Sequence, residues 1–428
     1  MNVRRSATAA PTLIAAVAMA MPLGGQASAA SPSSSQSTSS AALPAGLYGT
    51  GDPTYDGVWR QSLALLAQDT VGVKPAASAV DWLARQQCAN GAFAPFRSDT
   101  GSPCTAKTLV DTNSTGAAVQ ALAALGGRDA VVGRAVGWLK SVQNTDGGWG
   151  YAAGGASDAN STSVVVGALA AAGESPGEVT KGGEGGKGGK SPYDLLLKLA
   201  LPCDATGGGA FAYQPDKKGR LVANADATAA AVTGLLGKGF AGEDVKPTDT
   251  PLTCSDAADP GQAARNGAAY LVRALAKDKH LTSALAGAKD QPDYGNTADA
   301  VLALATAGQG QRAADALRWL EVTSAPWAKQ AGPAAYAPLI LAANAEADDP
   351  RDFGGQDLVA LLDATGPAPA SVPAYSPPTR AATEIQDDPT IEEGGDGFRK
   401  LWIVGIFLVA GIGIGFLISG RNKRKRQS

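Results

Sequence analysis

The stretch that decides the fold is 143-QNTDGGW-149, which joins one helical pattern to the next. The same spacing of a Gln, a glycine four residues later and an aromatic residue two after that recurs at 87–93 as QCANGAF. We expect the Gln to bond the backbone of the turn, the glycine to permit a tight bend, and the aromatic ring to pack over it. The residues with these predicted structural roles are Gln87, Gly91, Phe93, Gln143, Gly147 and Trp149.

A second pattern repeats after each such turn. It has a Thr, a Val four residues later and a Leu three after that, spacings that place all three on one face of a helix. Copies start at Thr115, Thr162, Thr228 and Thr297. They alternate with another kind of helix, which carries Trp-Leu or Tyr-Leu. We interpret 56–68 as a further partial copy of this Trp-Leu helix. Because one helical hairpin cannot bury its own apolar face, we expect five or six of them to stack.

The stretch 143–149 resembles the QW repeat of squalene and hopene cyclases. The alternating helices are similar to the α/α toroid shared by those cyclases, the β subunits of protein prenyltransferases, complement thioester domains and the cobalamin binders intrinsic factor and transcobalamin. The resemblance covers roughly residues 46–350. It implies an all-α fold, with an α/α toroid domain at 46–365, and it is more specific for fold than for function.

The catalytic motifs of that superfamily are absent from the sequence. It has no DxDD acid motif and no GCGEQ-like thioester stretch, and no Cys near the single histidine, His280, completes a prenyltransferase-like zinc site. The chain is therefore closest in character to the non-catalytic cobalamin binders. That resemblance implies no catalytic residue, no metal and no cofactor, with a cobalamin-like corrinoid as a ligand rather than a cofactor.

The two ends of the chain predict export and membrane anchoring. Residues 1–29 have a basic start, a short apolar run and an Ala-Ser-Ala end, which is typical of a cleaved signal peptide. The uncharged apolar run at 401–419 is long enough to cross a bilayer as one helix, and the basic tail at 420–428 predicts a cytoplasmic C-terminus. A flexible Ser- and Ala-rich segment at 30–45 and a stalk rich in Pro and acids at 366–400 flank the predicted extracellular toroid.

The exported part is acidic and contains all the cysteines. Without the two arginines of the signal and the five basic residues of the tail, 29 Lys and Arg remain against 39 Asp and Glu. This balance argues against nucleic acid or an anionic membrane surface as a partner. An even number of cysteines in an oxidising compartment predicts disulfides. Pairing of neighbours joins Cys88 to Cys104 and Cys203 to Cys254, and two other connectivities stay open.

Polar residues gather where the Thr-bearing helices are expected to begin. In a toroid the N-termini of the inner helices lie at one rim, so these side chains are candidates for lining a binding funnel. The alternative is that each one only caps its own helix, because Asp and Asn are preferred N-cap residues. Asn224 and Tyr213 stand at equivalent places. The candidate ligand-binding residues are Asp111, Asn113, Asp158, Asn160, Asp226, Asp293, Tyr151 and Tyr294.

These observations favour a membrane-anchored extracellular protein that captures a small molecule and passes it to a transporter subunit in the membrane. Two other interpretations stay open. One is an enzyme at the outer surface, either a terpenoid cyclase relative or a hydrolase that uses the rim carboxylates. The other is a scaffold or adhesion protein with no ligand.

Overall fold

The polypeptide is helical throughout the part that the computed structural model describes. Within those residues it forms thirteen α-helices, two short 3-10 helices and four two-residue strands, which agrees with the predicted all-α class. They belong to one compact unit, Leu43–Ser428. The described residues are 44–183, 188–242, 245, 248, 251–257, 259–283 and 291–373.

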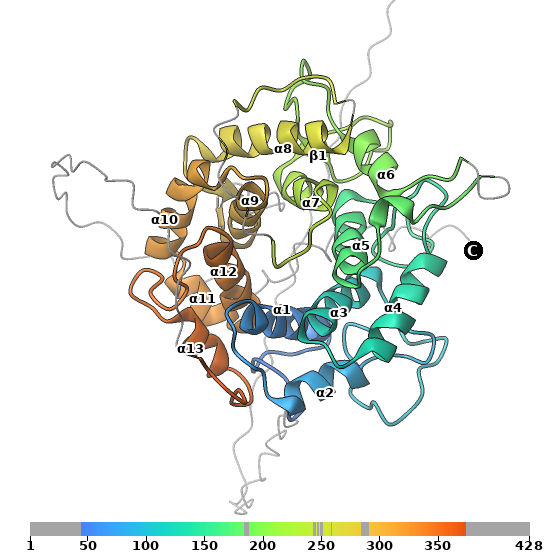
Figure 1. The fold of residues 1–428 in the computed structure, drawn as a ribbon, viewed down its shortest axis with the longest axis vertical. Coiled ribbons are helices and arrows are strands. Elements are labelled where there is room, and N and C mark those ends of the chain that lie inside the picture. The colour runs from blue at the N-terminus through green and yellow to red at the C-terminus, as the bar shows by residue number, and fades with distance from the viewer. Residues whose placement is uncertain are drawn as a thin grey trace, which may run out of the picture. The chain divides into compact units, whose positions relative to one another are not determined.

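Six of the helices form a closed inner ring (Figure 1). Each one packs against the next in chain order, and the last packs back on the first, which closes the ring. The partial pattern at 56–68 is α1 of this ring, so its interpretation as a Trp-bearing outer helix is wrong. The inner helices are α1 (Gly57–Thr70), α3 (Thr112–Leu125), α5 (Ala159–Ala171), α7 (Ala225–Leu235), α9 (Tyr294–Thr306) and α12 (Pro333–Ala345).

The remaining helices lie outside this ring, each against the inner helix next to it in sequence (Figure 1). Together the two rings form the α/α arrangement that the repeat predicts. Two antiparallel pairs of short strands lie at turns between helices, β1 (Phe211–Ala212) with β2 (Ala223–Asn224) and β3 (Leu281–Thr282) with β4 (Pro292–Asp293). The outer elements are α2 (Ala77–Arg85), α4 (Asp129–Ser141), η1 (Pro176–Glu178), α6 (Pro192–Leu199), α8 (Pro260–Leu275), η2 (Gly310–Arg312), α10 (Ala314–Thr323), α11 (Ala325–Ala331) and α13 (Leu358–Asp363).

The two rings differ in burial because their surroundings differ. An inner helix has neighbours on both flanks and an outer helix behind it, and α5 is accordingly buried at every residue from Ala159 to Leu169. Small residues allow this close approach: a Cβ on Gly116 of α3 would lie 2.7 Å from Val164 of α5. The outer helix α4 is amphipathic and buries four residues, among them Trp138 and Leu139.

The turn at 143–149 uses each of its characteristic residues as the sequence predicts. The side-chain amide of Gln143 donates to the carbonyl of Gly147 at 2.8 Å and to that of Val179, in the next hairpin, at 3.0 Å. Gly147 has φ +91°, and a Cβ there would lie 2.2 Å from the carbonyl oxygen of Ser191. The ring of Trp149 is buried and donates to Leu139 at 2.7 Å. The turn therefore joins two hairpins as well as two helices.

The repeated Thr has a structural reason that the sequence pattern did not reveal. In four inner helices its hydroxyl accepts a hydrogen bond, over 2.9–3.0 Å, from a backbone N–H of the preceding turn; the donor is the aromatic residue of the turn in three helices and Leu281 in α9. In α3, α7 and α9 the same hydroxyl donates to the carbonyl of the N-cap residue. The Thr side chain thus gives a backbone N–H of the turn its acceptor, and in three helices it adds a second donor to the N-cap carbonyl. The threonines are Thr115, Thr162, Thr228 and Thr297.

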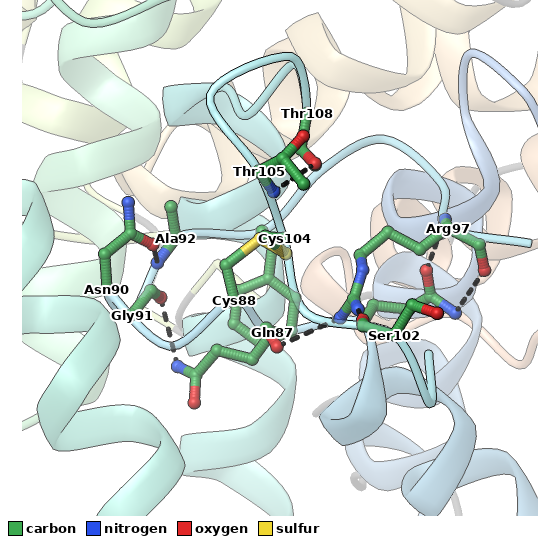
Figure 2. Close-up of a disulfide and its surroundings, with 12 residues drawn as sticks. Gln87, Cys88, Asn90, Gly91, Ala92, Arg97, Ser102, Cys104, Thr105 and Thr108 are labelled. Atoms are coloured by element: carbon green, nitrogen blue, oxygen red, sulfur yellow. Dashed lines mark hydrogen bonds between the residues drawn. A yellow bond between two sulfur atoms is a disulfide. The ribbon is translucent and has the colours of Figure 1, made fainter. Parts of the chain in front are cut away.

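Both predicted disulfides are confirmed, Cys88–Cys104 and Cys203–Cys254. The first closes the loop that follows the 87–93 turn (Figure 2). Inside that loop the guanidinium group of Arg97 donates to the carbonyls of Gln87 and Ser102. The loop is therefore held to its hairpin by one covalent bond and several hydrogen bonds.

The loop after α7 reaches across the interior of the ring (Figure 1). The backbone N–H of Phe240 donates to the side chain of Gln120 on α3 at 2.8 Å. Its ring packs edge-on against Trp59 of α1, with centroids 5.2 Å apart. Because α7 has α5 and α9 as its own ring neighbours, these contacts place Phe240 on the far side of the interior.

The predicted ends of the chain are only partly described. The signal peptide (1–29), the membrane span (401–419) and the tail (420–428) lie outside the described residues, as do most of 30–45 and of the stalk at 366–400. Among the helices that the structure describes, none is long and apolar enough to cross a membrane. The first residues of the predicted stalk stay with the ring, because the backbones of Ala370 and Ser371 bond that of Lys74.

Candidate functional site

Side chains cap the N-termini of four inner helices. Asp111, Asp158, Asn224 and Asp293 each accept a hydrogen bond from the backbone N–H three residues on, over 2.6–3.1 Å. Each bond satisfies one donor that the start of a helix leaves free. The cap of α7 is Asn224, so Asp226 does not precede its helix, as the sequence analysis supposed, but is the second residue inside it.

Two tyrosines connect the caps of one helix to the turn of the next hairpin. The hydroxyl of Tyr151 donates to the carboxylate of Asp111, and that of Tyr213 to Asp158. The carbonyls of both tyrosines also accept the first N–H of the same helices, at 2.8 and 3.0 Å. Burial and the adjacent carboxylate raise the pKa of both phenols, so they remain hydrogen-bond donors. Burial also raises the pKa of Asp111 and of Asp158 to about 6.

Asp226 belongs to a group of side chains on the inner face of the rim. The amide Nδ2 of Asn160, on the neighbouring α5, donates to its Oδ2 at 2.7 Å. Burial raises the pKa of Asp226 to about 6; the bond from Asn160 opposes this rise, and the carboxylates of Asp293 and Asp158 add to it. The N-termini of α5, α7 and α9 therefore meet closely enough for their carboxylates to repel one another.

Asp299 lies one turn further along α9 and completes this group. Its side chain is exposed, although Ala298 and Ala300 on either side of it are buried. Helix α9 has α7 and α12 on its flanks and α8 and α10 behind it, so its exposed side faces the middle of the ring (Figure 1). Burial nonetheless raises the pKa of Asp299 to about 8, and Asp226 and Asp293 raise it further.

Within the described part of the chain, no ion pair includes any carboxylate of this group. The described residues also hold no group of three or more His, Cys, Asp and Glu that suits a metal ion. Charged groups that are withdrawn from water and lack a counter-ion raise their pKa values and take up protons. The rim thus offers carboxyl groups that exchange protons near neutral pH.

Asp299 is the site residue that the sequence analysis missed. It stands two residues after the repeated Thr297. The other three copies have Ala117, Val164 and Ala230 at this position. A lone Asp in an otherwise apolar helix that is packed on three sides costs free energy, so this departure from the repeat was the available signal.

Asn113 is buried at 2% exposure, and neither polar atom of its side chain has a partner. Asn160 is buried to the same degree, and its Oδ1 is likewise unpartnered. Tyr294, in contrast, stacks between Trp319 and Trp327, with ring centroids 5.0 and 5.3 Å apart. The structure therefore leaves both polar atoms of Asn113 and one of Asn160 without a partner, and gives Tyr294 a packing role against the outer ring.

Other features lie away from the rim. His280 stacks on Trp319 with centroids 4.4 Å apart, and its Nδ1 lies 2.9 Å from the carbonyl of Leu281. One surface hollow is lined in part by Trp82 and Arg97, and another adjoins the Cys203–Cys254 disulfide. Neither hollow includes a carboxylate of the rim.

Comparison with known proteins leaves the family open. No protein-family model matches the chain, and no curated protein matches it. A protein from Actinoplanes is 18% identical, with a TM-score of 0.40 over 64% of this chain and 73% of that one. The type II terpene cyclase MstE from Scytonema is 15% identical, with a TM-score of 0.41 over 64% and 72%. The ent-copalyl diphosphate synthase from Streptomyces platensis is 15% identical, with a TM-score of 0.41 over 71% and 50%.

The finer resemblance to cobalamin binders finds no support in the comparisons. Identities and TM-scores this low do not identify an activity, so a function for this chain has to be argued from its own residues.

Proposed function

We propose that this chain is an enzyme that protonates a small organic substrate, with Asp299 as the proton donor and Asp226 as its neighbouring carboxylate. The observation that carries the proposal is the position of Asp299. It is an exposed carboxyl group on an inner helix, and burial together with the carboxylates of Asp226 and Asp293 raises its pKa to about 8. A general acid works best when its pKa lies near the working pH.

The two carboxyl groups have environments that suit different roles. The amide of Asn160 donates to Asp226 and favours its charged form. Asp299 has no hydrogen-bond partner among the described residues, and the neighbouring negative charges favour its protonated form. A pair of acids whose surroundings push their pKa values apart is the arrangement that acid catalysis uses.

Protonation is the step that the two enzymatic interpretations of the sequence share. A proton added to an alkene starts a cyclisation, and a proton added to a leaving oxygen starts a hydrolysis. The two disulfides suit an oxidising compartment, which supports a site outside the cell membrane, as the signal and the span predict. Capture of a ligand without turnover, a corrinoid included, is the second candidate, and the unpartnered amide of Asn113 favours it.

The protonation state is the first test. Full-length protein in detergent micelles, labelled with carbon-13 at the Asp carboxyl groups, is titrated by NMR between pH 4 and pH 10. Loss of one signal in Asp299→Asn identifies that residue, and the exposed Asp204 provides the matched control, Asp204→Asn. We expect Asp299 to titrate near pH 8. A midpoint below pH 5 would remove the basis of the proposal.

Turnover is the second test. Polyprenyl alcohols and aryl glycosides represent the two reaction classes, and each is incubated with the full chain. We expect product with one of them and a loss of about 100-fold or more in Asp299→Asn, within the usual contribution of a general acid. The Asp204→Asn variant should keep the full rate. Ligand retention without product, seen by native mass spectrometry, would favour the capture function instead.

A further inference from the structure

The second residues of neighbouring inner helices form a row along the rim. Asn113 is the second residue of α3, Asn160 of α5 and Asp226 of α7. These helices are consecutive neighbours in the ring. Because the N-caps and the Thr bonds repeat in register, the three side chains occupy equivalent places.

Of the two neighbouring pairs in this row, one is joined by a hydrogen bond and the other is not. We call the unbonded pair, Asn113 and Asn160, the open step. Between α5 and α7, Asn160 donates to Asp226 at 2.7 Å. Between α3 and α5, the equivalent bond is missing: Asn113 has no partner for its Nδ2 or its Oδ1, and Asn160 has none for its Oδ1. Both side chains are 2% exposed. Buried amides without partners are uncommon in native proteins and destabilise the fold.

We propose that the open step between Asn113 and Asn160 is a subsite that binds a neutral hydroxyl or carboxamide group of the ligand, beside the rim carboxylates. The unpartnered atoms comprise one donor, Nδ2 of Asn113, and two acceptors, the Oδ1 atoms of both residues. A group that both accepts and donates satisfies this set. An anion would leave the acceptors unpaired and would be repelled by Asp226 and Asp158, and a cation would leave the donor unpaired.

This subsite deepens the proposed function, on which it rests for the chemistry next to it, because it defines the class of substrate. A ligand that fits the row carries at least one polar group besides the atom that receives the proton. Hydroxylated or amide-bearing molecules meet that requirement, and a plain hydrocarbon chain does not. A site that bonds a hydroxyl or amide discriminates strongly against analogues that lack it, since its own buried polar groups then stay unpaired.

The direct test uses the side-chain amide signals of Asn113 and Asn160. Full-length protein labelled with nitrogen-15 at Asn is titrated with methyl β-glucoside, nicotinamide and toluene, which offer hydroxyls, a carboxamide and neither. We expect a saturable shift of both signals with at least one of the two polar probes and none with toluene. Absence of a saturable shift with both polar probes, or an equal shift with toluene, overturns the proposal.

Variants separate this subsite from the acid. Asn113→Leu should weaken binding of the responding probe about fivefold or more, because it removes the donor and one acceptor. Asp204→Asn, at an exposed site outside the subsite, should leave that binding within about twofold. Probe binding is measured without turnover, so loss of the acid function does not count against the subsite. Unchanged affinity in Asn113→Leu overturns it.

The stability of the ligand-free Asn113→Leu variant shows whether the substitution disturbs packing. The ligand-free Asn113→Leu variant should be as stable as the wild type or more so, since it removes unpaired groups. Asn144→Leu is the matched control, because Asn144 donates to Gly155 and Ser157 and should lose stability. If Asn113→Leu does not fold, the shifts in the wild-type protein decide alone.

Discussion

The turns around Gly91 and Gly147 and the inner rim around Asn160 and Asp226 differ in how completely their polar groups are paired. In the turns, Gln side chains, the repeated Thr and the backbone satisfy one another. At the rim, amide atoms lack partners and carboxylates lack cations within the described residues. The turns are built for stability, whereas the rim retains unfavourable groups that a ligand or a proton relieves. Substitutions should therefore destabilise the turns and leave the rim neutral or more stable.

The largest expected effect is at Gly147. Gly147→Ala should lower the free energy of unfolding by about 4 kcal/mol, because its φ of +91° is strained for Ala and the added Cβ meets the Ser191 carbonyl at 2.2 Å. Denaturant unfolding measures it. Gly173→Ala is the control, since Gly173 also has a positive φ but nothing lies within 4 Å. Equal losses in the two variants would show that the contact between hairpins is unimportant.

The second largest loss of stability is expected when the Cys88–Cys104 disulfide is removed. Replacing both residues by Ser should cost about 3 kcal/mol, the chain-entropy value for a closed loop of this length, since the cysteines are 16 residues apart. Thermal unfolding of the double variant against the wild type checks it. An unchanged melting temperature would mean that the hydrogen bonds of Arg97 already hold the loop.

A smaller loss is expected at Thr162. Thr162→Val keeps the shape but leaves the backbone N–H of Trp149 buried without its acceptor, which should cost about 2 kcal/mol. Thr70→Val serves as control, because that half-buried hydroxyl only donates to a carbonyl of its own helix. We expect the control to change stability by less than about 0.5 kcal/mol. A loss of that small size at Thr162 would contradict its bridging role.

The smallest effect has the opposite sign and lies at the rim. Burial raises the pKa of Asp299 to about 8 in the folded protein, whereas the unfolded chain ionises near pH 4. Unfolding therefore releases a proton between those values, and the carboxyl group lowers stability progressively as the pH rises from 4 to 8. Asp299→Asn should raise the free energy of unfolding by about 1–2 kcal/mol at pH 8 and by almost nothing at pH 4. The effect is smaller than that of a fully buried carboxyl group, because this side chain is exposed to solvent.

Melting curves of Asp299→Asn and the wild type at several pH values make this measurement. Asp204→Asn, at an exposed site outside the ring, is measured in parallel as the control. A gain that is constant with pH would mean that folding does not raise the pKa of Asp299, and a loss would mean that the folded protein stabilises its charged form.

How far the sequence predicts this protein varies from element to element. The Gln-Gly-aromatic spacing at 143–149 and the Thr-Val-Leu spacing predict the two kinds of helix, because each pattern reports local geometry and the buried face. The sequence also identifies Asp111, Asp158 and Asp293 as caps, since a cap bonds within three residues of itself. The interpretation of 56–68 as an outer helix is wrong because a Trp near the start of α1 resembles the Trp of the outer helices. In the structure α1 packs between α3 and α12, in the inner ring.

The sequence predicted the candidate site only in part, because short-range spacing does not reveal contacts between different hairpins. The sequence by itself determined the repeat, the caps and the residues available at the rim, all of which follow from short-range spacing. Tertiary structure alone decided that Tyr151 bonds Asp111, that Asn160 bonds Asp226, and that Asp299 faces the ring interior near Asp226. Those relations join residues of different hairpins, 66 positions apart in the case of Asn160 and Asp226. They exist only because closing the ring brings successive N-termini together, and a pKa or an unpartnered amide depends on that surrounding rather than on the residue itself.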